Sequence, residues 1–119
     1  MSVPPHDGRS AAQADAAMLL AMLLARHPGL PALHWTVTTK GDRLIGTSLG
    51  EDPSSQRAET SAWAGAVGVD LAEERIGDDT TYLCGQTVVY GIRLILHTMI
   101  IIWPDAGSEQ LLPRIFGAP

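Results

Sequence analysis

The sequence predicts an α+β fold of order αββαββ, in which two helices pack on one face of a four-stranded, mostly antiparallel sheet. Two observations support this prediction. Residues 11–26 and 54–76 are rich in helix-forming residues at helical spacing. Residues 33–49 and 80–103 instead alternate apolar with polar side chains, or are rich in β-branched residues, as strands are. Each half of the chain is therefore expected to form one αββ unit.

The first helix is expected over residues 11–26, where alanine, leucine and methionine dominate. Ser10 begins a capping box, and Pro28 lies just beyond the helix. A stripe of leucines, widened by methionines, suggests that this helix is buried on more than one side.

The first hairpin turns at Lys40-Gly41, where the glycine suits a positive φ. This turn places Val37 opposite Leu44 and Trp35 opposite Gly46. Because glycine has no side chain, Gly46 leaves room for the indole ring.

The second helix is expected over residues 54–76, with Asp52 as its N-cap. Gly77 can adopt the left-handed conformation that ends a helix. Gly65 and Gly68 lower the helix propensity, a cost that is best tolerated where another backbone packs close. We therefore expect this helix to lie unusually close to its neighbour.

The second hairpin turns at Tyr90-Gly91, which pairs Cys84 with His97 and leaves residues 92–103 as the longest strand. A two-layer domain buries one face of its sheet, yet the second face of this hairpin is also apolar. An exposed apolar patch of this kind usually marks an interface. The predicted interface residues are Tyr82, Val88, Ile95, Met99, Ile101 and Trp103. The residues expected to be mostly buried are Leu19, Leu23, Trp35, Val37, Leu44, Ala62, Ala66, Leu94 and Leu96.

The length of 119 residues suffices for one compact core. We expect a flexible N-terminal arm over residues 1–10, a single domain over residues 11–104 and a tail over residues 105–119. The formal net charge is −5, and the eight basic residues are scattered singly. This pattern argues against nucleic acid as a partner.

Cys84 is the only cysteine, which fits a reducing compartment. The apolar runs at residues 16–25 and 92–103 both fall short of the ~20 residues that a membrane-spanning helix needs. The N-terminus also lacks the order of a secretory signal. We therefore expect a cytoplasmic protein that does not bind membranes.

The motifs with catalytic resemblance have simpler structural interpretations. Residues 46–50, Gly-Thr-Ser-Leu-Gly, match the G-x-S-x-G pattern of serine hydrolases, but they are expected to lie in a hairpin rather than at a strand-to-helix turn. Cys84, His97 and Arg93 form a candidate pocket, in which a small apolar cysteine lies beside a hydrogen-bonded histidine. The sequence predicts no catalytic residue, no metal site and no cofactor.

Residues 30–37, Leu-Pro-Ala-Leu-His-Trp-Thr-Val, are followed by Gly41 and by a strand that ends near Gly50. This stretch resembles small actinobacterial and actinophage open reading frames of unknown function, as does the hairpin over residues 80–96. The resemblance implies a mobile-element context and carries over no catalytic residue and no ligand.

The apolar second face favours a non-enzymatic interaction module that forms a homodimer and binds an unidentified protein, such as an adaptor, a small chaperone or a phage accessory protein. The alternative is a small-molecule-binding domain or simple enzyme, with the candidate pocket between the second helix and the sheet. A second alternative is a DNA-associated accessory factor, which an arginine face of Arg43, Arg57 and Arg93 would favour.

Overall fold

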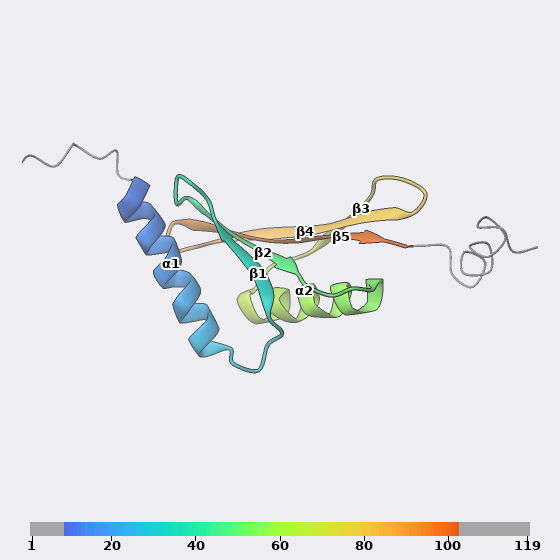
Figure 1. Ribbon diagram of the computed structural model, residues 1–119, viewed down its shortest axis with the longest axis horizontal. Helices are drawn as coiled ribbons and strands as arrows, with labels where there is room; N and C mark the ends of the chain where they lie inside the picture. The colour runs from blue at the N-terminus through green and yellow to red at the C-terminus, as the bar shows by residue number, and fades with distance from the viewer. Residues whose placement is uncertain (1–8, 103–119) are drawn as a thin grey trace, which may run out of the picture.

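The computed structural model describes residues 9–102, which form an α+β fold (Figure 1). Its elements are α1 (Arg9–Arg26), β1 (Leu33–Val37), β2 (Arg43–Ser48), α2 (Pro53–Val67), β3 (Ala72–Arg75), β4 (Thr80–Val89) and β5 (Ile92–Ile101). Trp103, the expected tail and all but the last two residues of the expected arm lie outside the described residues.

The sheet has five strands in the order β1-β2-β5-β4-β3, rather than the four that were expected. The hairpins β1–β2 and β4–β5 and the pair β3–β4 are antiparallel, but β2 and β5 run parallel, so the sheet is mixed. The parallel pair arises because the chain crosses from β2 through α2 to β3 at the opposite edge of the sheet. It then returns through β4 to β5, which lies beside β2.

The additional strand is β3, which occupies residues that were expected to continue the second helix. The helix ends at Gly68, whose φ of 76° is left-handed, so Gly77 is not its stop. Ala72–Arg75 contains good helix formers, but these residues pair with Thr81 to Cys84 of β4. Pairing with the open edge of β4, a strand of ten residues, therefore outweighs the helix propensity of Ala72–Arg75.

The glycines of α2 do not mediate close packing. A Cβ at either Gly65 or Gly68 would meet no atom within 4 Å. The expectation that this helix lies unusually close to its neighbour is therefore wrong. The start of the helix is as expected, because the Asp52 side chain accepts a hydrogen bond from the Ser55 backbone amide at 2.8 Å.

The first hairpin has the expected register, with Val37 opposite Leu44 and Trp35 opposite Gly46. A Cβ at Gly46 would lie 2.7 Å from the Trp35 ring, so any larger residue there would have to displace the indole. Ser10 is not an N-cap, because α1 begins one residue earlier.

Both helices cover the same face of the sheet, as expected, and the core lies between the two layers. Its buried residues are Ala16, Leu19, Leu23, Leu33, Leu44, Trp63, Ala64, Val69, Ile92, Leu94 and Leu96. Among the other residues expected to be buried, Trp35, Val37 and Ala62 are partly buried and Ala66 is exposed. Ala66 is exposed because α2 faces the sheet with Trp63 and Ala64 instead.

Candidate functional site

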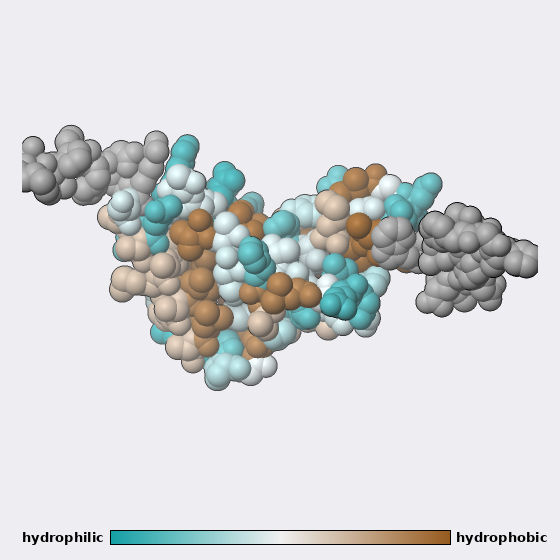
Figure 2. All heavy atoms as spheres, in the orientation of Figure 1, coloured by the Kyte–Doolittle hydropathy of each residue, from teal (hydrophilic) through white to brown (hydrophobic). Residues whose placement is uncertain are grey.

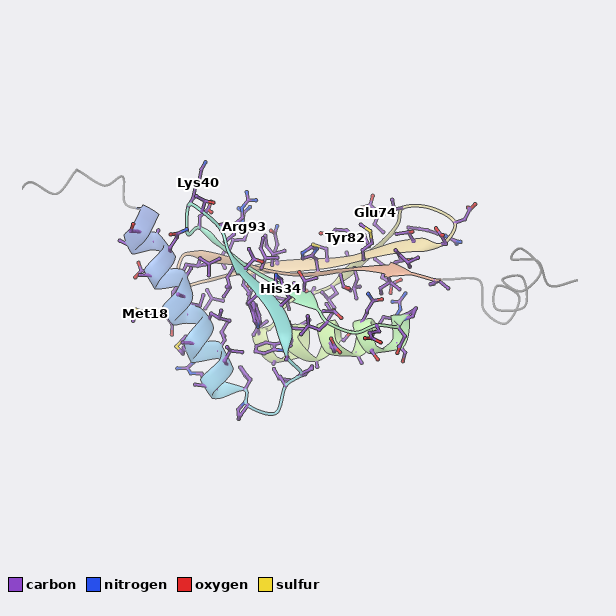
Figure 3. All side chains as sticks on the ribbon, viewed as in Figure 1. Met18, His34, Lys40, Glu74, Tyr82 and Arg93 are labelled. Carbon is purple, nitrogen blue, oxygen red and sulfur yellow. The ribbon has the colours of Figure 1, made fainter. Side chains whose placement is uncertain are left out.

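The face of the sheet opposite the helices has no covering layer among residues 9–102. We call it the open face. Alternate residues of β5 and their partners on β4 lie on it, and Figure 3 shows Tyr82, Glu74 and Arg93 on the side away from α2. The exposed apolar side chains there include Val88 at 64%, Met99 at 51% and Ile101 at 39%. Ile95 is half-buried between Ile45 and Gln86.

A hydrogen-bonded network occupies the middle of the open face. The Thr47 hydroxyl lies 3.0 Å from Nε2 of His97, and the Tyr82 hydroxyl lies 3.2 Å from Nδ1 of the same ring. The Tyr82 ring also packs edge-to-face on the His97 ring, with 5.7 Å between centroids. The network therefore joins strands β2, β5 and β4 through one histidine.

Burial sets the electrostatics of this network. Desolvation lowers the pKa of His97, because it disfavours the charged imidazolium. Desolvation, followed by a hydrogen bond to Cys84 and the charge of its thiolate form, raises the pKa of Tyr82 to about 12. At neutral pH both groups are uncharged, and one can donate the hydrogen bond that the other accepts.

Cys84 lies directly opposite His97 in the β4–β5 register and is a free thiol. Both ring nitrogens of His97 already contact hydroxyl groups, so this histidine is not free to act as a base for the cysteine. The arrangement holds side chains in place rather than preparing a nucleophile. Residues 9–102 also contain no group of three or more side chains that could hold a metal ion.

The candidate pocket residues Cys84, His97 and Arg93 share the open face. They therefore cannot line a pocket between α2 and the sheet, because α2 packs on the other face. Cys84 and Tyr82 border a broad, shallow depression of about 610 Å³, together with Asp70 and Glu74. Arg93 lies away from it, in a smaller hollow beside Arg43.

Opposite charges lie at the two ends of the open face. Arg43 of β2 lies beside Arg93 in the strand register, at the start of β5. Glu74 of β3 lies beside Tyr82, near the end of β5. Arg57 lies on α2 and forms an ion pair with Glu73. The arginine face that would have favoured DNA binding is therefore not formed.

The G-x-S-x-G stretch is a strand end held by a carboxylate. Glu59 Oε1 accepts hydrogen bonds from the Ser48 hydroxyl and from the backbone amides of Leu49 and Gly50, each at 3.0 Å. Ser48 is thus bound to an acid, and no histidine within residues 9–102 bonds to it, which supports the structural interpretation of this motif.

A second surface feature, which the sequence analysis did not identify, is an apolar groove of about 450 Å³ between α1 and the β4–β5 turn. Its lining residues are Asp15, Met18, Leu19, Met22, Tyr90 and Ile92. Met18 is 70% exposed and Tyr90 is 76% exposed. Figure 2 shows apolar residues over much of the visible surface of α1. The wide apolar stripe of α1 could have indicated an apolar surface in the sequence. That this surface lies beside Tyr90 could not be predicted, because it depends on the tertiary fold.

No family model matches the sequence, and neither the curated proteins nor the solved structures give a significant match. Within the part of the chain that the structure describes, no helix is long and apolar enough to cross a membrane.

Proposed function

We propose that this protein is a non-enzymatic, cytoplasmic interaction module that forms a homodimer through the open face. Such a dimer suits an adaptor, a small chaperone or an accessory protein of a phage or mobile element that binds a further protein. The observation that carries the proposal is the exposure of Val88, Met99 and Ile101 on a face that no helix covers in residues 9–102. Burying one large apolar side chain stabilises an assembly by roughly 1.5–3 kcal/mol.

A second copy of the chain fits this face because the face is complementary to itself in charge. Arg43 and Arg93 lie at one end of β5, and Glu74 lies towards the other. A two-fold axis that lies between the two sheets, perpendicular to β5, reverses the strand direction of the second copy, which places its acidic end over the basic end of the first. We therefore propose that the two sheets pack face to face with their β5 strands approximately antiparallel.

The area of the face limits the strength of this dimer. At ~3.3 Å per residue and ~4.8 Å between strands, the five strands present a face of ~550 Å². Stable interfaces bury ~800 Å² on each partner. The open face thus supplies roughly two-thirds of that area, which is consistent with dissociation in the micromolar range.

The test is the oligomeric state of the double variant Val88→Asp, Met99→Asp. Both side chains are at least half exposed, so the monomer should fold normally while the dimer is lost. The matched control is Leu24→Asp, which changes a side chain that is 43% exposed on α1, on the other side of the sheet. Analytical ultracentrifugation should show a dimer for the unmutated chain and the control, and a monomer for the double variant.

Three results would contradict the proposal. An unmutated chain that is monomeric at high micromolar concentration excludes self-association. A double variant that remains dimeric places the interface elsewhere. If raising the salt concentration strongly dissociates the unmutated dimer, the contact is ionic rather than apolar. Circular dichroism checks that every variant is folded.

A further inference from the structure

The apolar groove between α1 and the β4–β5 turn is lined mainly by large apolar side chains, of which Met18 and Tyr90 are well exposed. Met18 lies on the outer side of α1, as Figure 3 shows, and Tyr90 lies at the tip of the turn with a φ of 51°. Methionine side chains adapt to the shape of whatever they contact. Within residues 9–102, Asp15 is the one charged group in the lining of the groove. A segment that fits it is therefore apolar with one positive charge.

The chain itself contains such a segment. Residues 111–116 read Leu-Leu-Pro-Arg-Ile-Phe, which combines large apolar residues with a single arginine. A linker of nine residues, 102–110, lies between β5 and this segment, and its last seven residues, Pro-Asp-Ala-Gly-Ser-Glu-Gln, are polar or small. Arg114 is complementary to Asp15, and the flanking apolar residues match the methionines and Tyr90 of the groove.

The reach of the linker favours the groove of a second copy over the chain's own groove. The groove lies beside Ile92, at the start of β5, whereas the linker leaves from the end of β5. At ~3.3 Å per residue, β5 is ~33 Å long, and the nine-residue linker 102–110 spans ~30 Å when fully extended. A chain would reach its own groove only with a straight linker along the whole sheet. In an antiparallel dimer, the end of one β5 lies beside the start of the other.

We propose that residues 111–116 of each copy bind in the α1 groove of its partner. This inference rests on the proposed dimer and specifies how it is completed. The open face is smaller than the area that a stable interface buries on each partner. The two segments would supply the difference, because each one adds a second contact between the copies. The tail and the sheet face then act together, and the loss of either weakens the dimer.

The methionines provide a direct test, because the chain has only four of them. In a chain labelled with ¹³C at the methionine methyls, Met18 and Met22 report on the groove and Met99 reports on the open face. Single Met→Leu variants assign the signals. The double variant Ile115→Asp, Phe116→Asp should shift the Met18 and Met22 signals and leave Met99 nearly unchanged at a concentration where the variant is still dimeric. The control Ala106→Asp, Ser108→Asp adds the same charge within the linker and should shift none of them.

A mixing experiment distinguishes the partner's groove from the chain's own. The labelled Ile115→Asp, Phe116→Asp chain is mixed with an excess of unlabelled Met18→Asp chain, whose tail is intact. In the mixed dimer, the Met18 and Met22 signals of the labelled copy should return to their unmutated positions. If they do not return although mixed dimers form, the segment binds within its own chain and the proposal is wrong.

The same measurements separate this inference from the proposed function. If the unmutated chain is a monomer, both proposals fail together. If the dimer forms but the tail variant shifts Met99 instead of Met18 and Met22, the tail lies on the sheet and only this inference fails. Ultracentrifugation should also show that the tail variant weakens dimerisation by roughly tenfold, whereas the linker control does not.

Discussion

Both faces of β5 carry large apolar residues, but these residues differ sharply in exposure. On the covered face, Leu94, Leu96 and Ile100 are fully buried against the helical layer or beside it. On the open face, the alternating residues include Met99 and Ile101, which are 51% and 39% exposed. Hydrophobicity alone therefore does not decide which face becomes the core. The position of the helices decides it, and the apolar residues left over are available for association.

The largest expected effect of this difference is on stability. Leu96→Ala removes a fully buried side chain and should lower the free energy of unfolding by about 2–5 kcal/mol. Met99→Ala on the same strand should cost less than about 1 kcal/mol in the monomer, because its side chain is half exposed. Urea denaturation at concentrations where the protein is monomeric measures both. Equal losses would show that the open face is part of the monomer's core.

The second effect concerns backbone space in β2. Gly46→Ala would force a Cβ against the Trp35 ring on the covered face, which should cost about 1–3 kcal/mol by overpacking. Thr36→Ala, an exposed position on the open face of β1, should change stability by only a few tenths of a kcal/mol. Thermal melting of the two variants tests this contrast. A Gly46→Ala protein as stable as the parent would mean that the indole moves without cost.

A third substitution should stabilise the protein. Gly65 lies in α2 with its Cα pointing to open space, so Gly65→Ala meets no neighbour and gains helix propensity. The expected gain is about 0.5–1 kcal/mol, visible as a higher melting temperature. The matched variant Gly68→Ala should destabilise the protein instead, since its φ of 76° disfavours any side chain. A destabilised Gly65→Ala protein would restore the close-packing hypothesis for α2.

The smallest effect is the pH dependence contributed by His97. Because burial lowers its pKa below the ordinary value of 6.5, the unfolded chain binds this proton more readily than the folded chain does. Stability should therefore fall as the pH drops below 6.5, until it passes the lowered pKa. His97→Gln keeps polar groups near Thr47 and Tyr82 but should remove this contribution. Urea titrations at several pH values compare the two proteins, and identical profiles would contradict the assignment.

Much of the fold was predictable because the hairpins carry their own signals. Tyr90 and Gly91 both adopt positive φ, and the expected pairing of Cys84 with His97 is confirmed. The sequence could not reveal β3, since Ala72–Arg75 reads as helix until the edge of β4 is present. The parallel pairing of β2 with β5 was also hidden, because no local residue pattern encodes it.

The candidate site was predictable only in part, for the same reason. The period-two pattern correctly placed Val88, Met99 and Ile101 on one face. The contact of Thr47 with His97 depends on the β2–β5 register, which joins residues 50 apart in the chain. The groove beside Tyr90 likewise needs α1 to be placed against the far end of the second hairpin. Contacts between distant segments therefore account for what sequence patterns left out.

The parallel pairing of β2 with β5 also affects the rate at which the chain folds. Each αββ half closes mainly through neighbouring segments, whereas the central seam aligns Leu44 with Leu94 across the whole of α2, β3 and β4. Closing a long loop costs entropy before its contacts form, so this seam should be the slow step of folding. Until it closes, the β2 edge stays open and Leu44 lies uncovered. Slow closure of this seam should therefore make the newly made chain more prone to aggregate, whatever the stability of the finished fold.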